Sequence, residues 1–121
     1  MSITFQFLDA SLNRRLITLL EKHAIKHRVD QTGVIHFSPA DEEKVENDLI
    51  GLVRGQVFRS WQLVTCPDDW SDRYRAYMKV HDIPFQEERS NDETWFLIPR
   101  KHRPRLWKLD EPRAKKRALA R

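Results

Sequence analysis

Apolar residues follow two different periods along the first third of the chain. Residues 3–7 alternate apolar and polar, which predicts a strand with one buried face. The next apolar residues recur at the spacing of one helix face, which predicts an amphipathic helix; they are Leu12, Leu16, Leu19 and Leu20. Thr32-Gly33 then separates two short strand-like runs, and Ser38-Pro39 opens a second helix with a capping residue followed by proline. This segment reads strand, helix, strand, strand, helix.

The same order of elements returns in the second half. Trp70 falls on Leu12 at an offset of 58 residues, and the helix stripe continues at Tyr74, Tyr77 and Met78. The other matches at this spacing place Trp61, Leu63 and Thr65 on Ile3, Phe5 and Phe7, and His81 and Ile83 on His23 and Ile25. After a shift of three residues, Phe96 and Ile98 fall on Ile35 and Phe37. The repeated His and Ile are typical of a helix end followed by an apolar residue that packs in the core.

Two such βαββα halves predict an α+β fold with one six-stranded antiparallel sheet and helices on one face. Pairing the first strands of the two halves gives the strand order 2-3-1-4-6-5, and it removes an exposed edge from each half. This topology is similar to that of the ferredoxin-like regulatory modules, a likeness of fold alone. We expect one domain over residues 1–109, made of repeats at about 1–58 and 59–109, and a basic tail without packed structure at 110–121.

Charge is unevenly distributed along the chain. Residues 1–99 hold 12 Lys and Arg against 16 Asp and Glu, a balance of −4, whereas residues 100–121 hold 10 against 2, a balance of +8. A basic segment of this kind either remains solvated or contacts an anionic partner. The single cysteine excludes an internal disulfide and favours a reducing, cytoplasmic setting. The chain has no apolar run long enough to predict a membrane span.

Catalytic and metal-binding motifs are weak in this sequence. His23 and His27 are four residues apart, a spacing used by metal ligands on helices, but no third ligand accompanies them. Cys66 comes just before a predicted helix N-terminus, yet Asp68 and Asp69 disfavour its thiolate and no base is identified. We therefore expect no enzymatic activity, no cofactor and no metal, with Cys66 a small strand residue and the two aspartates N-terminal caps.

Alternation along the strands predicts an open sheet face that is more apolar than solvation requires. The residues of this face expected to bind a partner are Trp95, Leu97, Val64, Val34 and His36. A protein partner, or a second copy of the chain, would bury them with Trp95 as the anchor. The leading interpretation is therefore a small non-enzymatic interaction or regulatory protein that self-associates through this face.

A nucleic-acid-binding protein is the alternative interpretation. The expected contacts to an anionic partner are Arg100, Lys101, Arg103, Arg105, Lys108, Arg113, Lys115, Lys116 and Arg117. Trp95 could add base stacking, as exposed aromatic residues do on RNA-binding sheets, although no second aromatic is expected on that face. Both interpretations use the basic C-terminal segment, and they differ in the chemistry of the partner.

Overall fold

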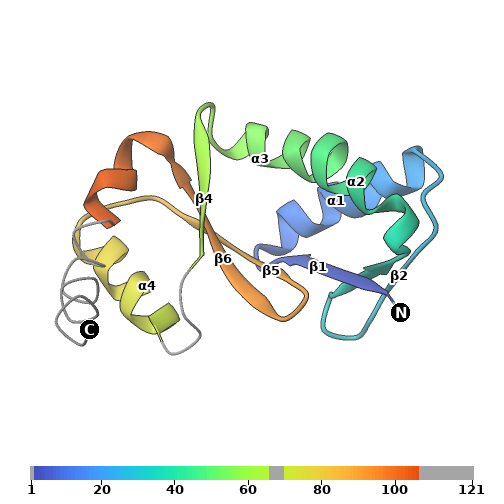
Figure 1. The fold of residues 1–121 in the computed structure, drawn as a ribbon, viewed down its shortest axis with the longest axis horizontal. Helices are drawn as coiled ribbons and strands as arrows, with labels where there is room; N and C mark the ends of the chain where they lie inside the picture. Colours follow the sequence, from blue (N-terminus) through green and yellow to red (C-terminus); the bar gives the residue numbers. More distant parts are fainter. Residues whose placement is uncertain (1, 66–69, 107–121) are drawn as a thin grey trace, which may run out of the picture.

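The computed structural model describes residues 2–65 and 70–106, which form one open sheet with helices packed on it (Figure 1). The strands are β1 (Ile3–Phe7), β2 (His27–Val29), β3 (Ile35–Phe37), β4 (Trp61–Thr65), β5 (Gln86–Ser90) and β6 (Glu93–Pro99). The longer helices are α1 (Ala10–Lys22) and α4 (Ser71–Val80). A continuous helical stretch contains η1 (Pro39–Asp41), α2 (Glu42–Lys44), the π-helical η2 (Val45–Ile50) and α3 (Gly51–Val57). The short η4 (Arg100–His102) follows β6. The α+β class and the single six-stranded antiparallel sheet are confirmed.

The strand order is β2-β3-β1-β5-β6-β4, which differs from the predicted order at the junction between the halves. Within each half the first and third strands are neighbours, and the second strand pairs with the other side of the third. The predicted pairing of β1 with β4 is wrong, because β1 pairs with β5 instead, with Phe7 opposite Glu88. As a result β4 lies at one edge of the sheet and β2 at the other.

Two contacts across the junction explain why β5 lies beside β1. The turn after β5 is held by Asn91, whose Oδ1 accepts from Thr4 N at 3.1 Å and whose N–H donates to Thr4 O at 3.1 Å. Arg54 of α3 donates two hydrogen bonds to the buried Glu88 carboxylate, at 3.0 and 2.7 Å. A carboxylate at this depth requires a charged partner, and Arg54 supplies one where β5 lies beside β1.

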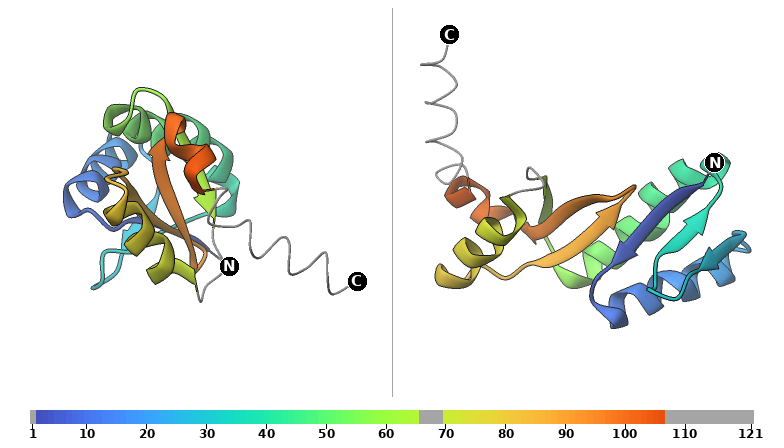
Figure 2. Two further views of the ribbon diagram at one scale, coloured as in Figure 1. Left: turned by 90° about the vertical axis from the view of Figure 1, so that its left-hand side faces the viewer. Right: turned by 90° about the horizontal axis from the view of Figure 1, so that it is seen from below.

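The helices lie on both faces of the sheet, so the prediction of helices on one face is wrong. Directly paired residues of antiparallel strands point to the same face, so Phe7, Glu88 and Trp95 share one face while Glu87 and Phe96 share the other. Phe7 belongs to the core under α1 and α3, whereas Phe96 belongs to the core under α4. Figure 2 shows α1 and α4 near opposite ends of the elongated molecule.

Each half has its own hydrophobic core. The first core contains Phe5, Phe7, Leu12, Leu16, Leu20, Ile25, Ile35, Phe37, Val45, Leu49, Ile50 and Val53. The second contains Val64, Tyr74, Met78, Ile83, Phe96, Ile98 and Leu106. The helix stripes expected from the sequence therefore do face the sheet, because their buried members belong to these cores.

The register of β4 differs from the predicted alignment with β1. Val64 pairs with Phe96 and faces the α4 core, whereas Leu63 pairs with Leu97 on the opposite face. The expected match of Leu63 to Phe5 is therefore wrong by one residue. Because strand side chains alternate, this slip moves every residue of β4 to the other face.

The ends of α1 and α4 confirm the interpretation of the repeated His and Ile. His23 and His81 are the C-caps, with φ and ψ of −93° and 9° and of −95° and 10°. The following Ala24 and Asp82 have φ of 54° and 53°, and the next N–H groups, of Ile25 and Ile83, donate to carbonyls five residues back. Both isoleucines are buried. These are Schellman ends in which a residue other than glycine occupies the left-handed position. The duplication as a whole stays a prediction.

Candidate functional site

A basic groove of about 640 Å³ lies where the ends of α3, α4 and β6 meet. Its lining residues are Val57, Phe58, Arg59, Ser60, Asp82, Pro84, Pro99, Arg100, Lys101 and His102. Arg59, Arg100 and Lys101 are exposed, and the single carboxylate in this lining belongs to Asp82. The groove is thus a concave surface with an excess of positive charge.

Hydrogen bonds hold the basic segment against β4 and α4. Arg100 N donates to Ser60 O at 3.0 Å, which continues the pairing of β6 with β4 and places η4 beside the start of β4. Farther along, Arg105 Nη1 donates to His81 O at 3.3 Å, and Tyr77 Oη donates to Arg105 O at 3.0 Å. The basic segment is therefore fixed against the C-terminal end of α4.

An apolar contact also holds this segment in place. Leu106 is fully buried in the core under α4, although the residues before it are mostly exposed. Burial of one leucine side chain contributes roughly 1.5–3 kcal/mol, so Leu106 anchors the turn that carries Arg103 and Arg105. The backbone that carries these basic residues is consequently held by a packed side chain.

The pKa of His102 is affected by the positive charges of the groove. Its pKa lies below the ordinary value, because burial disfavours the charged imidazolium and the nearby Arg105 and Lys101 repel a further positive charge. An anion bound beside these groups would reverse the repulsion and raise the pKa of His102. A change in the pKa of His102 can therefore be used to detect anion binding in the groove.

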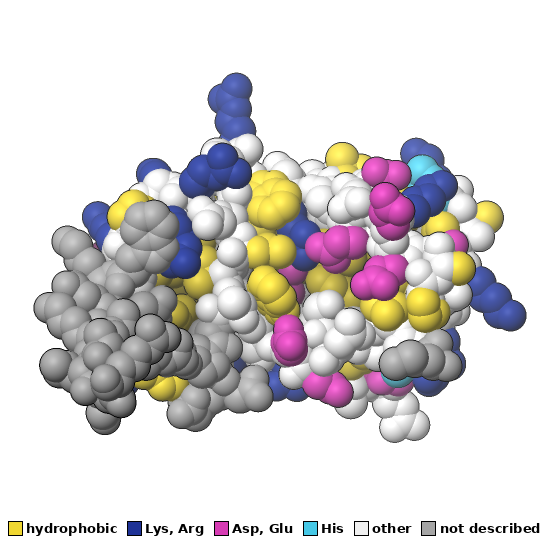
Figure 3. Space-filling view, in the orientation of Figure 1, with side chains coloured by type: hydrophobic (Ala, Val, Ile, Leu, Met, Phe, Trp, Pro, Cys, Tyr) yellow, Lys and Arg dark blue, Asp and Glu magenta, His cyan; other side chains and the backbone are white. Residues whose placement is uncertain are grey.

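Charge is unevenly distributed over the visible face of the molecule. Figure 3 shows Lys and Arg side chains around β4 and η4 and again at the right-hand end, with Asp and Glu side chains gathered over α2 and its neighbours. The helical stretch supplies Asp41, Glu42, Glu43, Glu46 and Asp48. A polyanion would be attracted to the η4 end and repelled from the helical stretch.

The predicted anion-binding residues divide into two groups. Arg100 and Lys101 line the groove, and Arg103 and Arg105 lie in the turn that follows η4. Lys108, Arg113, Lys115, Lys116 and Arg117 lie outside the described residues. Sequence reasoning missed Arg59 and His102 as members of this site. A signal for His102 was available, since it interrupts the basic run, but Arg59 joins the site only through the pairing of β4 with β6.

The predicted open apolar face does not exist as one surface. Val64 and Leu97 are 3% and 0% exposed, so their expected contact with a partner is contradicted by their burial. Val34 and His36 are half-buried. The alternation was assigned with the wrong register for β4, and it assumed that both halves leave the same face open. The sheet face beside α4 in the second half is covered, as is the face beside α1 in the first.

Trp95 lies beside the buried ion pair rather than on the open face. It lines a small cavity of about 150 Å³ together with Arg54, Glu88 and Glu46. Trp95 is half-buried, and its Nε1 is buried with no hydrogen-bond partner among the described residues. Trp95 is therefore not the exposed stacking platform that the sequence suggested.

The candidate metal ligands His23 and His27 are not assembled into a metal site among the described residues. Nδ1 of His27 is 2.8 Å from Ile25 O, and His23 caps α1. Within residues 2–65 and 70–106, no group of three or more His, Cys, Asp and Glu side chains is placed to hold a metal ion. Cys66, Asp68 and Asp69 lie outside the described residues.

No family model, curated protein or solved structure matches this chain. Among the described residues, every helix is too short or too polar to cross a membrane. The groove and its charges are therefore the basis on which a function can be proposed.

Proposed function

We propose that this protein is a non-enzymatic nucleic-acid-binding protein whose contact surface is the basic groove around η4. The observation that carries the proposal is the convergence of Arg59, Arg100 and Lys101 on one concave surface. Phosphate contacts from Lys and Arg supply most of the sequence-independent affinity for nucleic acids. The basic segment that begins at η4 continues in sequence to residue 121, with 10 Lys and Arg in residues 100–121.

Binding through this groove is expected to depend little on sequence. The open part of the sheet, opposite α1, carries polar side chains at its paired positions: Thr4, Gln6, Arg28, His36 and Arg89. None of these five is a Phe, Tyr or Trp on which a base could stack. Contacts to phosphates position a protein but do not read bases, so we expect similar affinity for unrelated sequences.

Self-association through a sheet face, the leading interpretation from the sequence, remains a proposal with weaker support. Two of its five contact residues, Val64 and Leu97, are in the core. An acidic protein could also occupy the groove, and the experiment below separates it from nucleic acid. Nucleic acid carries a denser and more regular negative charge than an acidic protein, so charge complementarity favours nucleic acid.

Fluorescence anisotropy with labelled single-stranded and duplex probes tests the proposal. The full chain is compared with Arg100→Gln/Lys101→Gln and with a control, Arg14→Gln/Lys44→Gln, which removes the same charge from exposed helix positions. Each phosphate contact contributes roughly −0.9 to the slope of log affinity against log salt on duplex DNA. The salt slope of the groove variant should therefore be shallower by up to about two phosphate contacts. The control variant should keep most of the salt slope of the full chain.

A second readout comes from His102. Binding of a polyanion in the groove should raise the pKa of His102, measured by NMR titration of its ring protons with and without the probe. The pKa of exposed histidines outside the groove, such as His23, serves as the reference. If no probe binds at low salt, or if the control variant weakens binding as much as the groove variant, the proposal is wrong and an acidic protein becomes the candidate partner.

A further inference from the structure

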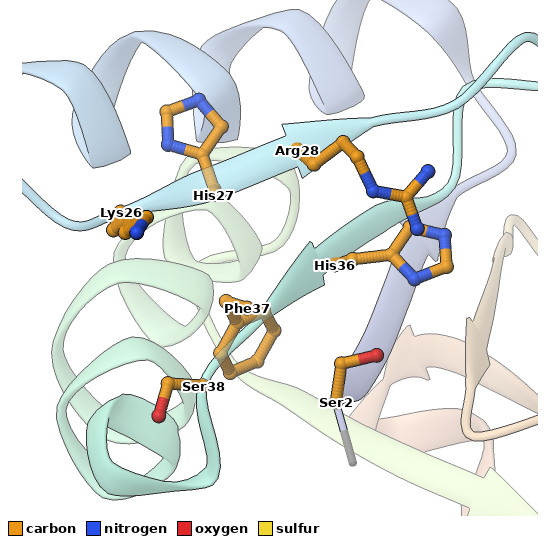
Figure 4. A pocket seen from close by; sticks show the side chains of 7 residues that line it. All are labelled: Ser2, Lys26, His27, Arg28, His36, Phe37 and Ser38. Atoms are coloured by element: carbon orange, nitrogen blue, oxygen red, sulfur yellow. The ribbon is translucent and has the colours of Figure 1, made fainter.

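A second hollow, of about 380 Å³, lies at the other end of the molecule, around the edge strand β2. Its lining residues are Ser2, Lys26, His27, Arg28, His36, Phe37 and Ser38, a set that contains cationic and hydroxyl groups and no carboxylate (Figure 4). The volume is within the range of small-molecule sites, roughly 300–1,000 Å³. This hollow does not include any residue of the groove around η4.

The sheet places two of these side chains on the same open face. Arg28 of β2 is paired with His36 of β3, and His36 is paired on its other side with Thr4 of β1. Paired residues of antiparallel strands project to the same side, with Cβ atoms about 4.5–5.5 Å apart. The Arg28 guanidinium and the His36 imidazole can therefore reach a common ligand from neighbouring strands.

The hairpin between β2 and β3 fixes the orientation of the imidazole. Asp30 Oδ2 lies 3.1 Å from His36 Nε2, while Asp30 Oδ1 accepts from Thr32 Oγ1 at 2.7 Å and from Thr32 N at 2.9 Å. The hydrogen bonds from the side chain of Thr32 and from His36 hold the pKa of Asp30 well below its usual range. A carboxylate can only accept a hydrogen bond, so His36 Nε2 is the donor and carries a proton.

This orientation leaves His36 Nδ1 as the ring nitrogen that a ligand can use. When the ring takes a second proton, Nδ1 becomes a charged donor on the same sheet face as the Arg28 guanidinium. We propose that this hollow is a binding site for a phosphate monoester, held by Arg28 and by the Nδ1–H of protonated His36. Lys26 and Ser2 line the same hollow and can donate to the remaining oxygens, whereas the Ser38 hydroxyl caps η1 by accepting from Ala40 N at 3.2 Å.

Asp30 is a positioning residue in this site. Its carboxylate faces Nε2 and does not line the hollow, so it orients the ring without repelling the ligand at close range. The titratable and charged groups around His36 are Asp30 from the hairpin, Arg28 and Lys26 from β2 and the residue before it, and Arg89 farther along the same face. His27 also lines the hollow, but it pairs with Phe37 and points to the opposite face. The three cationic side chains favour an anion, and Asp30 opposes it.

NMR titration of the full chain with inorganic phosphate and with adenosine 5′-monophosphate tests the site, with adenosine as the probe that lacks phosphate. We expect saturable shifts of the His36 ring signals with the two phosphates and no shift with adenosine. Arg28→Gln should weaken binding by about tenfold, the loss expected for one charge-assisted pair. Arg14→Gln, an exposed arginine on α1, should change the affinity little.

The role of His36 is tested with sulfate, because its charge does not change over the pH range in which imidazole titrates. Sulfate affinity should fall as the pH rises from about 5.5 to about 8 in the wild type, and it should be low and flat in His36→Asn. Asp30→Asn should keep the ring but alter its tautomer, visible in the ring ¹⁵N shifts, and weaken binding. Linear, unsaturable shifts that persist in Arg28→Gln would overturn the site.

The source of the phosphate is a separate arm of the same experiment. A short oligonucleotide with a 5′-phosphate is compared with the same oligonucleotide ending in a 5′-hydroxyl, both in the Arg100→Gln/Lys101→Gln background so that the groove contributes less. Stronger His36 shifts with the phosphorylated end assign the site to nucleic-acid termini. Equal shifts with both oligonucleotides, alongside saturable binding of the mononucleotide, assign it to a small phosphorylated ligand. The site does not depend on the proposed nucleic-acid function of the groove.

Discussion

Glu87 and Glu88 are adjacent on β5 and point to opposite faces of the sheet, and each is bound by an arginine through two hydrogen bonds. Arg75 of α4 binds Glu87, and Arg54 of α3 binds Glu88. The difference between the pairs is burial. The side chains of Arg54 and Glu88 are 5% and 1% exposed, whereas those of Arg75 and Glu87 are 28% and 12% exposed.

Burial changes what each pair does for the protein. Desolvation raises the pKa of Glu88 above its ordinary value, even though the hydrogen bonds and charge of Arg54 lower it. The pKa of Arg54 also lies above its ordinary value, because Glu88 and Glu46 outweigh its desolvation, but arginine is charged throughout. Glu88 is therefore the member of the buried pair whose charge changes with pH, and burial destabilises its ionised form.

We infer that the buried pair specifies the arrangement more than it stabilises it. Arg54 comes from the first half and Glu88 from the second, so their hydrogen bonds join the two halves where β5 lies beside β1. The Arg75 pair lies within the second half and does not join the halves. Arg54 also lies over the rings of Trp61 and Phe5, at 5.4 and 6.0 Å from their centroids, so it contacts the first strand of each half.

The largest effect is expected for Arg54→Met. Removing one partner leaves the Glu88 carboxylate buried without compensation, which typically costs about 3–5 kcal/mol. Urea denaturation followed by circular dichroism at pH 7 measures the free energy of unfolding. A loss below about 1 kcal/mol, the value of an exposed pair, would show that Glu88 relaxes to solvent.

The double variant Arg54→Met/Glu88→Leu should recover most or all of that loss. Replacing a buried ion pair with apolar side chains of similar volume is often neutral, or stabilising by about 1–4 kcal/mol. The same denaturation experiment measures it, and the β1–β5 amide contacts seen by NMR show whether the strand order persists. If the double variant is as unstable as the single one, the pair contributes net stability and the comparison above is wrong.

A pH series separates the two pairs further. The pKa of Glu88 is raised in the fold, so the native state binds this proton more tightly than the unfolded chain does. Stability associated with Glu88 is therefore gained as the pH falls toward its ordinary pKa, by at most about 1.4 kcal/mol per pH unit. The deficit of Arg54→Met should shrink from pH 7 to pH 5, while that of Arg75→Met stays nearly constant. Equal slopes in the two variants would contradict this assignment.

The smallest effect is expected for Arg75→Met. A partly exposed pair contributes about 0–1 kcal/mol, because solvent screens it and the side chains lose entropy on pairing. Thermal denaturation at low and high salt measures the change, which should decrease as salt rises. A loss as large as that of Arg54→Met would show that burial is not what distinguishes the pairs.

Local patterns in the sequence were sufficient for the elements themselves. The apolar stripe of α1 and the alternation of β1 follow from periods of 3.6 and 2, which side-chain direction alone imposes. The ends of α1 and α4 were also readable, since backbone N–H groups of the residues directly after each helix, including Ile25 and Ile83, satisfy its last carbonyls. The basic character of residues 100–105 needed no structure either.

The register of β4, the strand order and the site required the tertiary structure. Leu63 and Val64 are both apolar, so alternation could not decide which faces α4, and only packing against Phe96 did. The strand order brings together distant segments, as in the Arg54–Glu88 pair, whose members are 34 residues apart. Arg59 enters the groove through the pairing of β4 with β6, and His36 meets Arg28 through that of β2 with β3. Local periodicity shows which residues of a helix or strand lie on the same face of that element. The contacts above depend instead on which elements become neighbours. That choice is made by burying charge and apolar surface between segments far apart in the chain.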